Sequence, residues 1–207
     1  MTITYQVKQS VYVNLTNRCP CACRFCLRNN GPEVFGSGPL WLEREPTLEE
    51  VTASLDGWDY ARFREVVFCG YGEPTERLDV LLAAADHLKR LDAAPRVRVN
   101  TNGLSDLVHG RPTASLFAGK VDCLSISLNT DDAAEYLDLC RPKFGAAAYP
   151  ALLAFTREAA AVVPEVVMTV VDEPVTSIEK QARCRALAES LGARLRVRRY
   201  EAPSGNH

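Results

Sequence analysis

A dense run of cysteines near the N-terminus constrains this chain more than any other feature. Four of its eight cysteines lie within eight residues, directly after a short apolar run at 11–15 that is typical of a strand. Cys19, Cys23 and Cys26 have the spacing Cys-x3-Cys-x2-Cys, which lets one tight loop place its thiolates around a compact inorganic centre. Soft sulfur ligands suit iron–sulfur clusters and zinc. The run therefore predicts a metal centre at the end of a first strand.

Two kinds of metal centre fit this run. If Cys19, Cys23 and Cys26 hold a four-iron cluster, one iron keeps an open coordination position. Cys21 is then left out, because it lies between the first two ligands and is poorly placed to join them. If all four cysteines bind one ion, they form a tetrahedral structural zinc site. Zinc modules usually combine two separated pairs, and no second Cys-x2-Cys or His pair follows. We favour the cluster and keep zinc as the alternative.

Composition indicates the number of domains and the cellular compartment of the protein. The chain has 207 residues, 47% of them hydrophobic, which is enough for one sizeable core, so we predict a single domain over 1–207. No apolar run approaches the roughly 20 residues that span a bilayer, and the N-terminus lacks the basic and apolar regions of a signal peptide. We therefore predict a cytoplasmic protein whose cysteines are thiols or metal ligands rather than disulfides. A net charge of -2 excludes a broad attraction to nucleic acid or anionic membranes.

Hydrophobic patterns predict strands that alternate with helices. The predicted strands are 11–15, 64–69, 96–100, 121–128, 166–171 and 194–200. The predicted helices are 47–55, 77–91, 105–118 with a break at Pro112, 131–139, 149–163 and 176–191. Such alternation implies parallel strands joined by crossovers, and six units are too few for a closed eight-stranded barrel. We predict an α/β fold, an open partial (βα)6 barrel with outer helices, with its chemistry at the C-terminal strand ends.

The segment 29–46 is rich in glycine and proline and predicts an irregular connection. Loops of this length in compact domains are often functional, which makes the segment a candidate lid over a substrate. A plain surface loop is the alternative.

Polar or glycine-rich motifs follow the next three predicted strands as well. Gly70-Tyr71-Gly72-Glu73-Pro74 follows the second strand, Thr101-Asn102-Gly103 follows the third, and Ser127 and Asn129 end the fourth. Glycine lets the backbone approach a ligand closely, and short hydroxyl and amide side chains donate and accept hydrogen bonds without adding bulk. Each motif alone could be an ordinary turn. Together with the cysteines they favour one binding site.

The pattern Cys-x3-Cys-x-aromatic-Cys, with Phe25 as the aromatic residue, resembles the signature of the radical S-adenosylmethionine (radical SAM) enzymes. The resemblance implies that Cys19, Cys23 and Cys26 hold a [4Fe–4S] cluster whose free iron binds the amino and carboxylate groups of SAM. The run 13–21 looks most like the small TatD-associated members. In the family a Gly-Gly-Glu-Pro loop binds the SAM amino group, whereas here Tyr71 separates the two glycines. The cofactor contacts implied are Phe25, Gly70, Tyr71, Gly72, Glu73, Thr101, Asn102, Ser127 and Asn129.

The resemblance also implies an activity and partners. A radical SAM enzyme cleaves SAM reductively to methionine and a 5'-deoxyadenosyl radical, which removes hydrogen from a substrate, here unidentified. It needs an electron donor such as flavodoxin or ferredoxin, and the TatD-associated group points to a TatD-like hydrolase as a partner. The alternatives are a 7-carboxy-7-deazaguanine synthase-like enzyme, a glycyl-radical activase or, from another class, a binding module stabilised by zinc or an iron–sulfur cluster.

Arginines supply candidate substrate contacts. Arg194, Arg196 and Arg198 alternate with apolar residues in the last predicted strand and therefore share one face. That face could bind a phosphate or carboxylate, or it could be a charged sheet edge that discourages aggregation. Arg141 lies in Cys140-Arg141-Pro142, which resembles a segment of the TatD-associated group, and it could bind an anion or form a surface ion pair. We predict substrate contacts by Arg141, Arg196 and Arg198.

Overall fold

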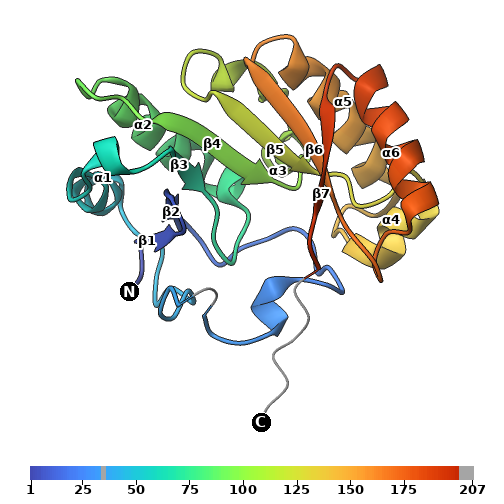
Figure 1. Cartoon of the computed structure of the whole chain (residues 1–207), viewed down its shortest axis with the longest axis horizontal. Coiled ribbons are helices and arrows are strands. Elements are labelled where there is room, and N and C mark those ends of the chain that lie inside the picture. The colour runs from blue at the N-terminus through green and yellow to red at the C-terminus, as the bar shows by residue number, and fades with distance from the viewer. Residues whose placement is uncertain (34–35, 201–207) are drawn as a thin grey trace.

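In the described part of the chain, seven strands form one sheet in which their spatial order follows the sequence. The computed structural model describes residues 1–33 and 36–200 (Figure 1). The strands are β1 (Thr4–Val7), β2 (Ser10–Val13), β3 (Glu65–Phe68), β4 (Arg96–Thr101), β5 (Cys123–Ser127), β6 (Glu165–Val171) and β7 (Arg194–Arg198). All neighbours from β2 to β7 are parallel. The predicted α/β fold with an open partial barrel is confirmed.

The strand β1 was missing from the prediction of an all-parallel sheet. It pairs antiparallel with β2 through a tight turn at 8–9, in which Lys8 has a φ of 53°. The strand is only four residues long, and its turn lacks the Asn-Gly or Asp-Gly pair that marks most two-residue hairpins. The local pattern was therefore too weak to show it.

The helices are α1 (Leu48–Asp56), α2 (Leu78–Lys89), α3 (Ser105–His109), α4 (Ala133–Cys140), α5 (Ala148–Ala160) and α6 (Ile178–Ser190). The helix α1 begins with a capping box, in which the Glu50 amide donates to Thr47 Oγ1 at 3.3 Å and the Thr47 amide donates to Glu50 Oε2 at 2.9 Å. The helix predicted over 105–118 is shorter than expected. It ends at His109 because Gly110 adopts the left-handed conformation, and a 3-10 turn at Ala114–Phe117 follows.

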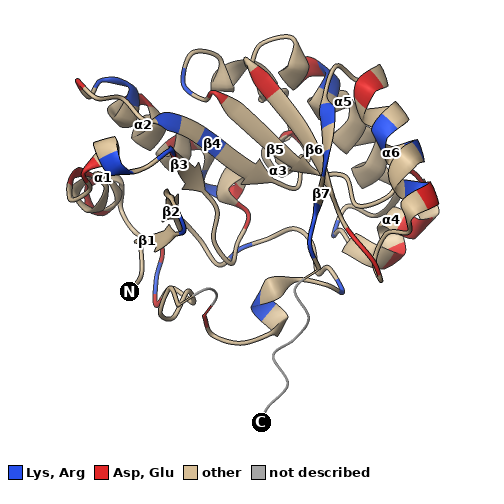
Figure 2. Ribbon diagram, viewed as in Figure 1, with Lys and Arg blue, Asp and Glu red and all other residues tan. Residues whose placement is uncertain are grey.

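The two faces of the sheet differ in chemistry, because side chains alternate along each strand. One face packs against the helices in a single apolar cluster, in which Phe68, Val99 and Ile126 from the strands join Leu81 and Phe155 from the helices. The opposite face, called the inner face below, is more polar and includes charged residues of β4 and β7, two strands on which Figure 2 marks Lys and Arg. Its members include Arg98, Asn100, Ser125, Thr169, Arg194, Arg196 and Arg198.

The segment 29–46 forms no helix or strand in its described residues after Asn29, and residues 34 and 35 lie outside the described part. Side chains of the loop that follows β2 hold it. Asn14 Nδ2 donates to the Leu40 carbonyl at 2.8 Å, and Asn17 Nδ2 donates to the Leu42 carbonyl at 2.7 Å. The segment thus packs beside the residues that lead into the cysteines, and its role as a lid stays a prediction.

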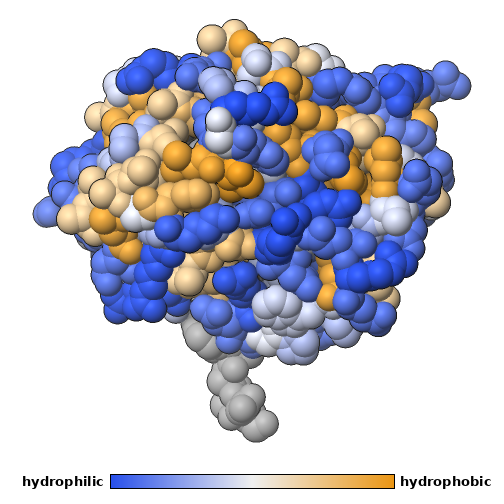
Figure 3. Space-filling model, turned by 180° about the vertical axis from the view of Figure 1, so that it is seen from behind, coloured by the Kyte–Doolittle hydropathy of each residue, from blue (hydrophilic) through white to orange (hydrophobic). Residues whose placement is uncertain are grey.

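The molecular surface shows no broad apolar face on the side drawn in Figure 3, where hydrophobic and hydrophilic residues are interspersed. Among the described residues, no helix is both long and apolar enough to cross a membrane.

A hydrogen bond couples β1 to the end of β3. The hydroxyl of the buried Tyr5 donates to the Cys69 carbonyl at 3.0 Å. We expect Tyr5→Phe to lower the free energy of unfolding by about 1 kcal/mol in urea denaturation, because one net hydrogen bond is lost and a carbonyl loses its donor. Tyr200→Phe is the control, since the Tyr200 hydroxyl makes no hydrogen bond within the described residues. Equal effects of the two substitutions would contradict this account.

Candidate functional site

The loops that follow β2, β3 and β4 meet at one edge of the sheet. The Glu73 amide donates to the Arg18 carbonyl at 2.8 Å, and the Asn102 amide donates to Glu73 Oε2 at 2.7 Å. Asn102 Nδ2 lies 3.9 Å from Cys19 Sγ and 3.8 Å from Cys21 Sγ. The structure therefore brings the cysteine run, the Gly-Tyr-Gly-Glu-Pro loop and the Thr-Asn-Gly turn together.

The C-terminal end of α4 holds the other side of the cysteine loop. The Ala22 amide donates to the Cys140 carbonyl at 3.1 Å, the Arg24 amide donates to the Leu139 carbonyl at 3.0 Å, and the Lys143 amide donates to the Pro20 carbonyl at 2.8 Å. Cys21 and Pro142 also form an isolated antiparallel bridge. The segment 139–143 thus pairs with the cysteine loop, a contact that the sequence analysis missed.

The cysteines differ in their access to a ligand. Cys19, Cys23 and Cys26 are half-buried, whereas Cys21 and Cys140 are buried. Hydrogen bonds from the Cys140 and Cys21 thiols hold the pKa of Cys23 well below its ordinary value. The same bonds, together with burial, raise the pKa values of Cys21 and Cys140. Cys23 therefore ionises more readily than an ordinary thiol, and thiolate is the form that binds metals.

Three half-buried sulfurs on one short loop match the donor set of an iron–sulfur cluster, and the burial of Cys21 agrees with its exclusion as a ligand. Among the described residues, no three His, Cys, Asp or Glu side chains are grouped closely enough to hold a single metal ion. A four-iron cluster is wider than one ion, so its ligands lie further apart, and it could be held by Cys19, Cys23 and Cys26.

The carboxylate of Glu73 links two loops. It is 4% exposed and accepts from the Thr75 amide at 3.1 Å, from Thr75 Oγ1 at 2.8 Å and from the Asn102 amide at 2.7 Å. Burial raises its pKa, and these hydrogen bonds partly oppose the rise. A carboxylate accepts about four hydrogen bonds, so little capacity is left for a ligand. The side chain mainly holds the loops together.

The two glycines after β3 allow a close approach of the chain. A Cβ atom at Gly72 would lie 2.2 Å from the Thr16 carbonyl oxygen, and one at Gly70 would lie 2.0 Å from Asn14 Oδ1. The side chain of Tyr71 is used elsewhere, because its hydroxyl donates to the Gly31 carbonyl at 2.7 Å. Its ring also meets Trp41 edge-on, with the centroids 5.2 Å apart. At position 71 the backbone is thus what a ligand at the strand end could contact.

Asn129 has an unused acceptor at the end of β5. The residue is 3% exposed, and its Nδ2 donates to Cys140 Sγ at 3.3 Å. Its Oδ1 is buried and has no hydrogen-bond partner among the described residues. An unpaired buried acceptor is costly, so a ligand that donates a hydrogen bond would stabilise this position. This acceptor and the three accessible thiols fit a sulfur-bound cluster with a polar ligand beside it.

The remaining predicted contacts lie close by. Thr101 is buried and accepts from the Gly103 amide at 3.1 Å, while Phe25 and Ser127 are half-buried. Arg141 is exposed and ends α4 with a φ of 46°, next to the cysteine loop.

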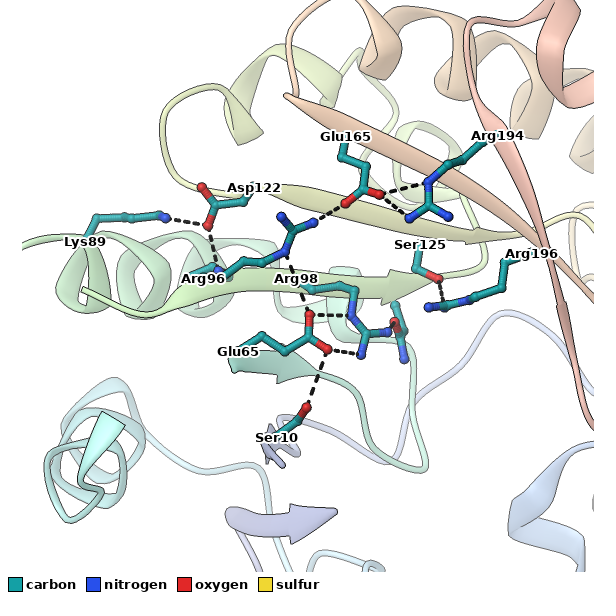
Figure 4. A network of polar contacts seen from close by, with 12 residues as sticks. Ser10, Glu65, Lys89, Arg96, Arg98, Asp122, Ser125, Glu165, Arg194 and Arg196 are labelled. Carbon is teal, nitrogen blue, oxygen red and sulfur yellow. Dashed lines mark hydrogen bonds and ion pairs between the residues drawn. The ribbon is translucent and has the colours of Figure 1, made fainter. Parts of the chain in front are cut away.

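Arg196 lies on the inner face (Figure 4), and Arg198 shares this face because it is two residues further along β7. Arg98 lies on the same face and was not predicted. It donates to Glu65 Oε1 at 2.7 Å and to Asn100 Oδ1 at 2.8 Å. The alternation of arginine and apolar residues at 96–100, which matches that at 194–198, is the signal that could have identified it.

The chain is similar to known proteins in sequence and in fold. Residues 13–176 match the family model described as the Radical SAM superfamily. A GTP 3',8-cyclase of Corynebacterium glutamicum (strain R) is 32% identical over 143 residues, which cover 66% of this chain and 35% of that relative. The chain thus spans about a third of the length of this curated relative.

Solved structures share the fold. Streptococcus suis SuiB bound to its precursor peptide SuiA superimposes with a TM-score of 0.68 at 15% identity, over 93% of this chain and 39% of that one. A radical SAM methyltransferase from Sphaerobacter thermophilus gives a TM-score of 0.62 at 18% identity, over 95% of this chain and 57% of that one.

The close approach at Gly72 can be tested by adding a methyl group. We expect Gly72→Ala to lower the free energy of unfolding by about 1–3 kcal/mol, because the segment 16–18 must move away. Gly57→Ala is the matched control, since its Cβ would make an ordinary contact 3.6 Å from the Ser54 carbonyl oxygen. Urea denaturation of both variants measures the difference. A change below about 0.5 kcal/mol at Gly72 would contradict the contact.

Proposed function

Because this chain belongs to the radical SAM superfamily, we propose that it is a radical SAM enzyme whose [4Fe–4S] cluster is held by Cys19, Cys23 and Cys26. The observation that carries the proposal is that the loop with these three half-buried cysteines lies against the loops that follow β3 and β4, where the Cys19 thiol is 3.9 Å from Asn102 Nδ2. The family uses this cluster together with SAM. When bound, the two supply an electron and a 5'-deoxyadenosyl radical that takes a hydrogen atom from a substrate.

We propose distinct tasks for the residues around the cysteines. The backbone of Gly70, Tyr71 and Gly72 lines the place of the SAM amino group, and Glu73 fixes that loop against Asn102. Asn129 Oδ1 accepts a hydrogen bond from SAM, which is supported by its lack of another partner among the described residues. Phe25, Thr101, Asn102 and Ser127 complete the wall at the strand ends. Arg141 provides a positive charge beside the cysteine loop.

At the finer level, we propose that the protein is one of the small TatD-associated radical SAM proteins. The run 13–21 supports this, and so does Cys140-Arg141-Pro142, which pairs with the cysteine loop. Its partners are then a flavodoxin or ferredoxin in the cytoplasm and a TatD-like hydrolase. The activity of the Corynebacterium relative is not carried over, because the match covers only 35% of that protein.

The proposed activity is tested by product analysis. After anaerobic reconstitution with iron and sulfide and reduction with dithionite, we expect methionine and 5'-deoxyadenosine to form from SAM in equal amounts. Liquid chromatography with mass spectrometry measures both products. Their absence from a sample with a verified iron content would contradict the proposal.

The identity of the ligands is tested with cysteine variants. We expect Cys23→Ala to lose the cluster, because two thiolates remain from the proposed set of three. Cys21→Ala should keep its iron content and its visible absorption, since Cys21 is buried and lies outside that set. Cys184→Ala, at a buried cysteine on α6, controls for the loss of a thiol as such. A Cys21→Ala protein that folds but fails to bind iron would favour a site with four cysteine ligands.

A further inference from the structure

The inner face carries more positive than negative charge in its described part. Glu65 pairs with Arg98, and Glu165 pairs with Arg96 and Arg194, near the N-terminal ends of the strands (Figure 4). Arg196 and Arg198 lie further along β7, and neither has a carboxylate within ion-pair distance in residues 1–33 and 36–200. Two positive charges on this face therefore lack a counterion there.

Arg196 is the more confined of the two. Its side chain reaches from β7 across β6 to β5, where Nη2 donates to Ser125 Oγ at 2.9 Å, and Ser125 is only 4% exposed. The Nε atom of Arg196 is buried and has no hydrogen-bond partner among the described residues. Buried donors are normally paired, so we expect an acceptor that is not part of the described chain to bind here.

The surroundings of Arg196 make the missing acceptor more costly. Burial, followed by the positive charges of Arg98 and Arg198, lowers the pKa of Arg196. Within the described residues, this guanidinium thus has like charges near it, and its recorded hydrogen bond goes to the Ser125 hydroxyl. An anion would offset the repulsion between these arginines and would also accept a hydrogen bond from the unpaired N–H of Arg196.

The position of Arg196 suits a substrate. Arg196 pairs in register with Thr169, two residues before the end of β6, and Ser125 lies two residues before the end of β5. Two residues at about 3.3 Å each place Arg196 roughly 7 Å from the C-terminal ends of the strands, where the cysteine loop lies. Asn100 is opposite Ser125 on β4, so its amide borders the same area.

We propose that Arg196, with Ser125 and Arg198, binds an oxyanion of the substrate, a carboxylate or a phosphate, on the inner face of the partial barrel. This inference rests on the proposed function, which places the cofactors at the strand ends above it. The guanidinium offers its unpaired Nε–H as a donor and its positive charge to an oxygen of this group. Ser125 keeps the fork in place, and Arg198 adds charge at the open side.

Probe binding tests the site. Isothermal titration of the iron-loaded protein with inorganic pyrophosphate and with malonate separates a phosphate from a carboxylate preference, and saturable binding of either probe supports the proposal. We expect Arg196→Gln to weaken binding at least about tenfold, because a charge-assisted contact is lost. Arg194→Gln is the matched control on the same strand and face, whose arginine already pairs with Glu165. Binding of neither probe, or equal weakening in both variants, would overturn the site.

Two further measurements, the stability of the variant and competition with SAM, also test the proposal. Without a probe, Arg196→Gln should raise the midpoint of urea unfolding, because a half-buried charge among like charges is removed. A lower midpoint would show that Arg196 has a purely structural role. The probe and SAM should bind at the same time, whereas competition between them would assign the arginine to the SAM carboxylate and overturn the proposal. A wild-type protein that binds the probe through Arg196 but forms no 5'-deoxyadenosine would refute the proposed function and leave the anion site standing.

Discussion

The buried carboxylate of Glu73 is the contact on which the candidate site depends. Parallel strands bring the loops at their carboxyl ends to one edge, but they do not fix those loops relative to each other. Glu73 does so by accepting from the Asn102 amide after β4, while its own amide donates to Arg18 just before the cysteines. Since Gly72 allows the chain to approach Thr16 closely, the cysteine loop is fixed against the ends of two strands. The place of any cluster on that loop follows from these contacts.

Much of the fold could be predicted because the relevant signals are local. Alternating strands and helices, the capping box at Thr47 and Glu50, and the polar motifs after successive strands are all visible in short windows. The strand β1 was missed because four residues and an unmarked turn give too weak a pattern. The pairing of the cysteine loop with residues 139–143 could not be predicted, because a contact between distant backbone segments leaves no local signature. For the same reason, the sequence could not show that the side chains of Tyr71 and Glu73 bind other loops.

The inner face has ion pairs near the N-terminal ends of the strands and unpaired polar groups nearer their C-terminal ends. Ion pairs around Glu65 and Glu165 tie β3, β4, β6 and β7 together near their N-terminal ends. Higher on the same face, Arg196 has an unpaired donor, and at the strand ends Asn129 has an unpaired acceptor, as judged over the described residues. Unpaired buried polar groups are rare in folded proteins, and these two lie below and beside the motifs that follow the strands. They mark the places where the proposed substrate and SAM would complete the structure.

The central claim is that three cysteine ligands leave one iron of a cluster open to SAM. Electron paramagnetic resonance of the anaerobically reduced protein, recorded with and without SAM, tests this claim most directly. The account predicts a [4Fe–4S]+ signal whose shape changes when SAM is added, because SAM binds the open iron. A cluster signal that saturating SAM leaves unchanged, or a colourless protein that holds only zinc, would contradict it.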